Sequence, residues 1–274
     1  MKRIKSVLPL LLLLTLHGAT QAQTKYVAVD NSARSSSPVG ASTGAASRTP
    51  DADSINNTGC VYADAGEYEK AIEQFKLAIA LKPQLSEAHN NLGYAYALSG
   101  RHAEALAALK EATRLNPASS RAQFNLGRVY MDTEQPKAAL KHLQQSIALE
   151  PDFAEGHNQL GVVYDRLGRH REALKSLLEA TRLNPRSLSA LNNLGVVQSN
   201  AKQYDAAIKT LRGALELDPN FAQAQYNLGS VYAMLKDKRA ALELHTTLKQ
   251  LDAELGRLLY GEIYRDKILD VNQK

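Results

Sequence analysis

Small and apolar residues recur along this chain with a fixed period of 34 residues, from about residue 52 to near the C-terminus. Within each period they fall at three- and four-residue spacings in two separate stretches, which predicts two helices. In the second period the first stretch ends before Gly100, and the second runs from His102 to Leu115. Asn116-Pro117 then ends the second helix, because proline disfavours the helical conformation in the residue before it. Each period is therefore predicted to form a pair of antiparallel helices.

Six consecutive periods keep this pattern without an insertion, which predicts an all-α solenoid of stacked helix pairs. Two series of small residues mark the points where helices approach closely, because a larger side chain would force them apart. They are Gly59, Gly93, Gly127, Gly161, Gly195 and Gly229 in the first helices, and Ala71, Ala105, Ala139, Ala173, Ala207 and Ala241 in the second helices. The apolar residues expected to fill the facing slot are Phe75, Leu109, Leu143, Leu177 and Leu211.

A tyrosine follows five of the six glycines at a distance of three residues, and Gln198 replaces it in the fifth period. A ladder of tyrosines suggests either a stack for a ligand or a repeated core position. Aromatic rings at fixed helical spacing are usually core, so we interpret the tyrosines as packing residues.

The repeated residues resemble the tetratricopeptide repeat, with glycine at its eighth place, tyrosine at the eleventh, alanine at the twentieth and twenty-seventh and proline at the thirty-second. The resemblance covers residues 52 to about 255. It implies a right-handed superhelical solenoid of antiparallel helix pairs over 52–253, with repeats at 52–85, 86–119, 120–153, 154–187, 188–221 and 222–253. The sixth repeat departs from the pattern at His245. Residues 254–274, after the helix-capping Asp252, are predicted to form a capping helix and tail.

The first 22 residues have the layout of a signal peptide, with a basic start, an apolar run and small residues at the end. An uncleaved membrane anchor is the alternative, although the apolar run is shorter than the ~20 residues that cross a bilayer. No cysteine follows the run to carry a lipid, so we expect an exported protein that is periplasmic or secreted. Residues 23–51 are rich in serine, alanine and glycine and are predicted to form a disordered linker.

Charge and cysteine content narrow the function classes. Removing the three cations of the predicted signal peptide lowers the formal net charge from +5 to +2. No dense basic stripe remains, so nucleic acid is not an expected partner. The single cysteine, Cys60, cannot form an internal disulfide and is interpreted as a packing residue. We expect solvated histidines and no enzyme activity, metal or cofactor, because no residues have the spacing of a catalytic or metal site.

The resemblance implies that the first helix of each pair lines a concave groove, in which an extended peptide or a partner helix binds. The candidate groove residues are Asn57, Asn91, Tyr94, Arg121, Phe124, Asn125, Arg128, Gln159, Arg166, Asn193, Tyr226 and Asn227. The first helices of the first two repeats carry no lysine or arginine. The basic clamp of the chaperone-binding members of the family is therefore incomplete, and chaperone docking is not expected.

A carboxamide stands two residues before every repeat glycine, at Asn57, Asn91, Asn125, Gln159, Asn193 and Asn227. Asparagine is a poor helix former, so helix propensity does not explain the series. A carboxamide both donates and accepts hydrogen bonds, which suits it to clamp a peptide backbone. In this the series resembles the asparagine ladder in the repeat domain of O-linked N-acetylglucosamine transferase. There are two alternatives. These amides tie adjacent helix pairs together, or they recur only because the repeats follow a common consensus sequence.

These features predict a non-catalytic scaffold that binds a protein or peptide partner in the groove, as a monomer or within a larger complex. One alternative is a structural subunit of an envelope or secretion complex that uses its convex face and ends. Another is an accessory subunit of a separate enzyme. A cleaved protein would have no stable membrane span.

Overall fold

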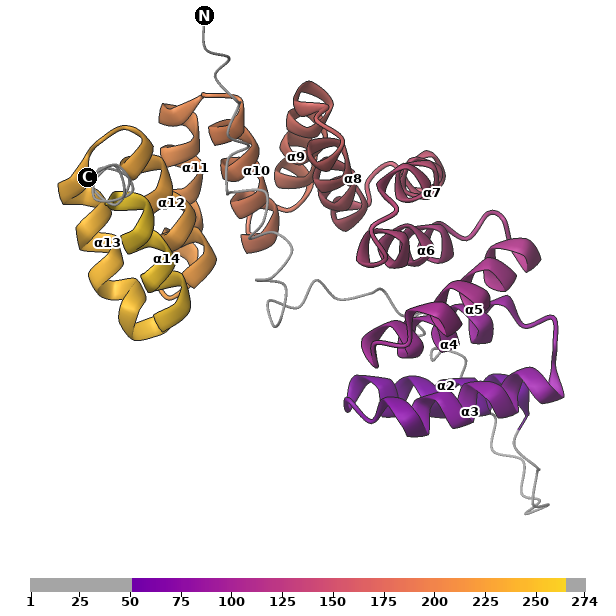
Figure 1. Cartoon of the computed structure of the whole chain (residues 1–274). Coiled ribbons are helices and arrows are strands. Elements are labelled where there is room, and N and C mark those ends of the chain that lie inside the picture. Colours follow the sequence, from indigo (N-terminus) through magenta and orange to yellow (C-terminus); the bar gives the residue numbers. More distant parts are fainter. Residues whose placement is uncertain (1–50, 265–274) are drawn as a thin grey trace, which may run out of the picture. The chain divides into compact units, whose positions relative to one another are not determined.

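A computed structural model of the chain describes residues 51–264 (Figure 1). The predicted signal peptide, residues 23–50 of the predicted linker and the final ten residues lie outside this range. Thirteen helices and no strand are present within it, which confirms the all-α prediction. The first helices of the pairs are α2 (Ala52–Asp64), α4 (Ser86–Leu98), α6 (Ser120–Asp132), α8 (Ala154–Arg166), α10 (Leu188–Asn200) and α12 (Ala222–Met234). The second helices are α3 (Tyr68–Leu81), α5 (His102–Leu115), α7 (Pro136–Leu149), α9 (His170–Leu183), α11 (Tyr204–Leu217) and α13 (Lys238–Leu251), and α14 (Ala253–Ile263) follows.

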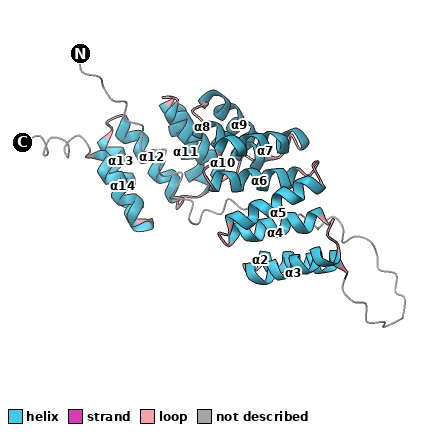
Figure 2. Cartoon of the chain, turned by 45° about the vertical axis from the view of Figure 1, so that its right-hand side comes forward, coloured by secondary structure: helices cyan, strands magenta, loops and turns pink. Residues whose placement is uncertain are grey.

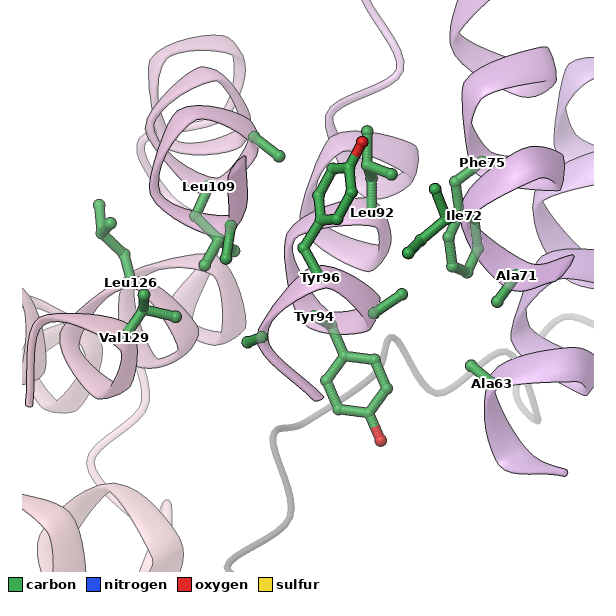
Figure 3. Packing of buried hydrophobic residues seen from close by; sticks show 14 residues of the cluster. Ala63, Ala71, Ile72, Phe75, Leu92, Tyr94, Tyr96, Leu109, Leu126 and Val129 are labelled. Atoms are coloured by element: carbon green, nitrogen blue, oxygen red, sulfur yellow. The ribbon is translucent and has the colours of Figure 1, made fainter. Parts of the chain in front are cut away.

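The helices belong to two compact units, an N-terminal unit of residues 51–152 and a C-terminal unit of residues 153–264. In each unit a first helix packs against the second helix of its own pair and against that of the pair before it. Short loops join the helices (Figure 2). In the N-terminal unit, buried side chains of α3 such as Phe75 and Ile72 share one core with Leu92 and Tyr96 of α4 (Figure 3). Within this unit the stacked pairs therefore share a core that no single pair would supply.

The repeat glycines lie where the two helices of a pair touch. A Cβ atom added at Gly93 would stand 2.5 Å from Cγ of Leu109, and one at Gly195 would stand 2.5 Å from Cγ of Leu211. Both leucines are fully buried. The predicted contact between the glycine series and the apolar slot of the second helices is therefore confirmed.

The sixth pair keeps the glycine but not its usual partner. A Cβ at Gly229 would stand 2.5 Å from Cδ2 of Leu259, which belongs to α14 rather than to α13. His245 occupies the equivalent position of α13 and lies against the ring of Tyr260, with the two centroids 5.3 Å apart. Helix α14 thus supplies the apolar side chain that the sixth repeat lacks.

Local contacts fix the start and the placement of α14. The carboxylate of Asp252 accepts hydrogen bonds from the backbone N–H groups of Glu254 and Leu255, both at 3.0 Å, which caps the helix as predicted. A Cβ at Gly256 would stand 2.9 Å from Cα of Lys249, so this glycine lets α14 cross the backbone of α13. Glu262 accepts hydrogen bonds from Tyr226 at 2.6 Å and from Ser230 at 2.5 Å, which join α14 to α12.

Each helix pair turns through one residue with a left-handed backbone. Three repeats place glycine there, namely Gly66, Gly100 and Gly168, with φ of 78°, 77° and 73°. The other three have Glu134, Lys202 and Lys236, with φ of 57°, 61° and 61°. A side chain in this conformation costs about 1 kcal/mol or more, so the geometry of the turn comes from the packing of the pair and not from the local sequence.

Replacing Leu259 with alanine is expected to lower the free energy of unfolding by about 2–5 kcal/mol, because the side chain is fully buried beside Gly229. Urea unfolding followed by circular dichroism measures the change. The control is Arg257→Ala in the same helix, whose side chain is exposed and whose replacement should change stability by less than about 0.5 kcal/mol. Equal stability of the two variants would contradict the assignment of α14 to the core.

Candidate functional site

All twelve candidate groove residues lie on first helices, but they differ in exposure. In the N-terminal unit Asn57 is exposed and Arg121 is half-buried. The other residues of that unit are at most 8% exposed, namely Asn91, Tyr94, Phe124, Asn125 and Arg128. These five buried residues therefore contribute to the packing of the fold, in addition to any role in binding.

In the C-terminal unit three candidate residues, Gln159, Arg166 and Asn193, are half-buried and lie on the helices α8 and α10. Tyr226 is 2% exposed, and its hydroxyl group donates to Glu262 of α14. Asn227 is 8% exposed. The accessible part of the predicted site in this unit is therefore formed by the side chains of α8 and α10.

Side-chain amides form a continuous chain across three helix pairs of the N-terminal unit. Asn125 Nδ2 donates to Asn90 Oδ1 of the preceding pair at 3.0 Å. Asn90 Nδ2 donates to its neighbour Asn91 Oδ1 at 3.3 Å. Asn91 Nδ2 then donates to Asn56 Oδ1 of the first pair at 3.1 Å and also lies 3.3 Å from Cys60 Sγ. Each amide thus has its neighbour's oxygen or nitrogen as a partner inside the protein.

The C-terminal unit repeats the same bond between pairs. Asn193 Nδ2 donates to Asn158 Oδ1 at 3.0 Å, and Asn227 Nδ2 donates to Asn192 Oδ1 at 2.7 Å. In all four cases the donor stands two residues before a repeat glycine and the acceptor stands 35 residues earlier in the chain. We call this hydrogen bond an amide rung.

For four of the six carboxamides the amide rungs confirm the interpretation that the series ties adjacent helix pairs together. The residues that accept these hydrogen bonds stand one position before the carboxamide of their own repeat. The sequence pattern did not predict them as partners, although asparagine occupies this position in four of the six repeats. Phe124 and Tyr226 stand at that position in the other two. One rung uses a single N–H of the donor amide, and a carboxamide has a second N–H and an oxygen with two lone pairs. The peptide clamp therefore stays a prediction that is compatible with the rungs.

The tyrosine series is core, as predicted, with Tyr96, Tyr164 and Tyr232 between 6% and 8% exposed. Basic side chains cover the rings. The guanidinium carbon of Arg101 lies 4.5 Å from the ring centroid of Tyr96, and that of Arg169 lies 4.7 Å from that of Tyr164. These cations stabilise the ring faces that the core leaves uncovered.

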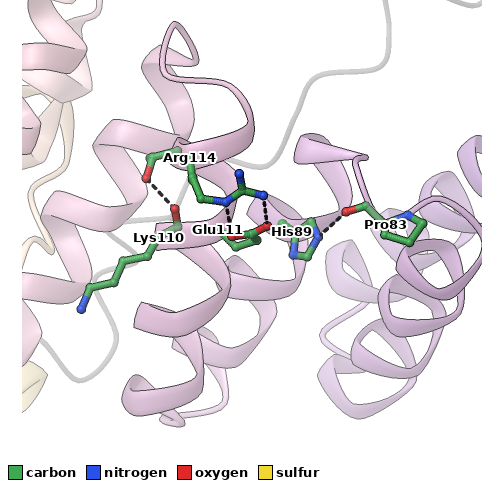
Figure 4. A network of polar contacts seen from close by, with 6 residues as sticks. Pro83, His89, Lys110, Glu111 and Arg114 are labelled. Atoms are coloured by element: carbon green, nitrogen blue, oxygen red, sulfur yellow. Dashed lines mark hydrogen bonds and ion pairs between the residues drawn. The ribbon is translucent and has the colours of Figure 1, made fainter.

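Two histidines, His89 and His170, keep access to solvent, as expected, and also form hydrogen bonds within the protein. His89 Nε2 forms a hydrogen bond with the carbonyl oxygen of Pro83 at 3.0 Å, across the turn that joins the first two pairs (Figure 4). His170 Nδ1 lies 2.8 Å from Asp165 Oδ1, and Asn200 Nδ2 donates to Asp165 Oδ2 at 3.3 Å. The sequence spacing did not indicate these partners because they lie at loop ends and in the next repeat.

Two buried groups beside the N-terminal amide rungs titrate at unusually high pH. Burial raises the pKa of the Cys60 thiol to about 11, with smaller contributions from Asp64 and Glu87. Burial also raises the pKa of the Tyr94 hydroxyl to about 12. At neutral pH the thiol is therefore protonated and a poor nucleophile, which supports the packing role given to Cys60.

The described residues hold neither a cluster of metal ligands nor a helix that could span a membrane. No three histidine, cysteine, aspartate or glutamate side chains between residues 51 and 264 stand close enough together to hold a metal ion. No helix in this range is both long enough and apolar enough to cross a membrane.

Family models described as TPR repeat and tetratricopeptide repeat match successive parts of the chain. The first matches residues 59–100 and 200–236, and two others match residues 97–158 and 154–187. Together they cover all six predicted repeats in part or in full. No curated protein matches the chain in sequence.

Several solved structures share the fold. The APC/C hetero-tetramer Cut9–Hcn1 matches with a TM-score of 0.70 and 24% identity over 78% of this chain, which spans only 43% of that chain. Pseudomonas aeruginosa pilF matches with a TM-score of 0.69 and 18% identity over 78% of this chain and 97% of its own. YrrB, described as a TPR protein with an unusual peptide-binding site, matches with a TM-score of 0.55 and 25% identity over 66% of this chain and 95% of its own.

Breaking one amide rung is expected to destabilise the protein. Asn227→Ala leaves Asn192 Oδ1 without its donor and should lower the free energy of unfolding by about 1–3 kcal/mol. The double variant with Asn192→Ala should lose less than the sum of the single variants, because both remove the same bond. Urea unfolding of the four proteins measures this coupling. Asn220→Ala, at an exposed loop position, is the control, and additive effects at positions 192 and 227 would contradict the rung.

The thiol of Cys60 is expected to ionise near pH 11 in the folded protein and near its ordinary pKa of 9.0 after unfolding in urea. Because the folded-state pKa is the higher one, this group's contribution to stability is complete below pH 9 and is lost as the pH rises to about 11. The pH dependence of the rate at which iodoacetamide alkylates Cys60, measured by mass spectrometry, follows the ionisation. Similar titration curves for the folded and unfolded chains would contradict burial of the thiol.

Proposed function

Because the chain belongs to the tetratricopeptide repeat family, we propose that it is a scaffold that binds an extended segment of a partner protein along its first helices. The fold is of a kind that generally serves protein–protein interaction without catalysis. The likeness to YrrB, whose description names a peptide-binding site, supports a peptide as the ligand.

The observation that carries this proposal is the arrangement of α8 and α10. Asn193 is half-buried, and its rung to Asn158 holds the amide in one orientation while engaging one N–H. The remaining amide groups suit the alternating donors and acceptors of an extended backbone. Gln159 and Arg166, both half-buried on α8, add a further amide and a positive charge. A rigidly held amide binds a peptide at a lower entropic cost than a mobile one.

A photo-crosslinking amino acid placed at Gln159 tests the proposal in the full chain. Crosslinks from this position to one short segment of a partner are expected, and mass spectrometry identifies both the partner and the segment. The matched control places the same amino acid at Lys209, an exposed residue of the second helix α11. Crosslinks that form from Lys209 and not from Gln159 would contradict groove binding and favour assembly through the second helices.

Export of the protein is part of the proposal and follows from the sequence of its first 22 residues. Expression of the full chain in a bacterial host should give a mature protein that begins near Gln23 in the exported fraction. N-terminal sequencing measures this. A purified protein that still carries residues 1–22 would contradict cleavage.

A further inference from the structure

Three of the five tyrosines have a cation on the preceding second helix, and Tyr164, with Gln144 at that position, is covered by Arg169 of its own repeat. Nζ of Lys110 lies 5.9 Å from the ring centroid of Tyr130 in the N-terminal unit, and the guanidinium carbon of Arg212 lies 6.0 Å from that of Tyr232 in the C-terminal unit. Lys76 and Tyr96 form the same pair at 5.8 Å. In each case the cation stands twenty residues before the ring. In most repeats, therefore, a basic side chain covers the tyrosine ring.

The fifth repeat has lost both members of the pair. Gln198 replaces the tyrosine, and Leu178, twenty residues earlier on α9, replaces the cation. Gln203 also stands at the loop position where Arg101 and Arg169 reach the rings of their own repeats. Among the described repeats the fifth alone has neither the ring nor a cation that covers it.

Each replacement leaves an unmet interaction. Leu178 is 54% exposed, although apolar side chains are stabilised by burial. Gln198 is 8% exposed, and its buried oxygen Oε1 has no hydrogen-bond partner among the described residues. A buried acceptor without a donor costs about 1–3 kcal/mol, so a ligand that supplies the donor recovers this energy. A ligand that satisfies both residues must offer an apolar contact to Leu178 and an N–H or O–H group to Gln198.

Positive charge surrounds the exposed leucine. Arg171, Lys175, Leu178 and Arg182 stand at four-, three- and four-residue spacings on α9, so they share one face of the helix, and all four are exposed. Arg182 pairs with Glu179 at 2.7 Å. At 3.6 residues per turn, Gln198 lies about 140° around α10 from Asn193, so this surface is separate from the amide rungs.

We propose that this surface, formed by Arg171, Lys175, Leu178, Arg182 and Gln198, is a second docking site that binds an acidic amphipathic segment of a partner protein. Leu178 packs against an apolar side chain of that segment, and Arg171 and Lys175 pair with its carboxylates. A change in the Gln198 rotamer lets Oε1 accept a hydrogen bond from the segment. Binding to an anionic lipid surface is the alternative, and phosphatidylserine vesicles distinguish it from binding to a protein segment.

The test uses the full chain and a fluorescein-labelled helical peptide in which leucines at seven-residue spacing are flanked by glutamates. Fluorescence anisotropy is expected to show saturable binding that weakens with added salt. The decisive variant restores the usual pair with Leu178→Lys and Gln198→Tyr together. This variant keeps every cation and gains one, so an acidic peptide held by charge alone would bind it as well or better. We expect at least tenfold weaker binding.

Three controls separate docking from unfolding and from general stickiness. The restored variant should keep the circular dichroism spectrum and unfolding midpoint of the original chain, since it copies a pair that the other repeats use. Leu77→Glu changes an equally exposed leucine of α3, 52% exposed, and should alter binding less than twofold. A peptide with lysine in place of glutamate should not bind.

Four results would overturn the proposal. They are the absence of binding to the original chain, undiminished binding to the restored variant, an equal loss in Leu77→Glu, and equal binding of the original chain to phosphatidylserine vesicles. Groove binding is tested at Gln159 by a different method, so failure of one site leaves the other standing.

Discussion

The close contact between a glycine of each first helix and an apolar side chain facing it is the constraint on which the rest of the structure depends. The distance of 2.5 Å from a notional Cβ at Gly93 to Leu109 leaves no room for any side chain. This contact sets how near the two helices of a pair lie, and hence which of their other residues meet the next pair. The sixth pair meets the same requirement with Leu259 of α14, so the C-terminal helix is part of the repeat core as well as its cover.

Polar contacts then fix one pair against the next. An apolar interface between helices tolerates small shifts, whereas an amide rung has one donor, one acceptor and a narrow range of distance. Four such rungs, between 2.7 and 3.1 Å long, link neighbouring pairs within the two units. They hold the first helices in register, and that register positions Gln159, Arg166 and Asn193 on the surface where a peptide is proposed to bind. The same amides thus serve the fold and, by our proposal, the site.

Regularity makes the exceptions informative. Five repeats cover the tyrosine with a cation, and one has a buried glutamine in place of the ring and, twenty residues earlier, an exposed leucine. Three turns place glycine in the left-handed conformation, and three place a charged residue there at a cost in stability. Comparison among the repeats of one chain shows which residues the packing requires, and a residue that departs from the pattern needs a separate reason.

The sequence alone determined the period, the all-α class, the helix pairs and the residues of closest approach, because a 34-residue repeat leaves each glycine and each apolar residue at the same place in every pair. It also placed Asp252 before α14 as a helix cap. Only the tertiary structure decided that Leu259 fills the place beside Gly229, that His89 binds the carbonyl group of Pro83, and that Asn193 donates to Asn158. These contacts form only because one helix or helix pair packs on another in a particular way. A pattern along a single helix gives the face on which a side chain stands but not the atom that it meets.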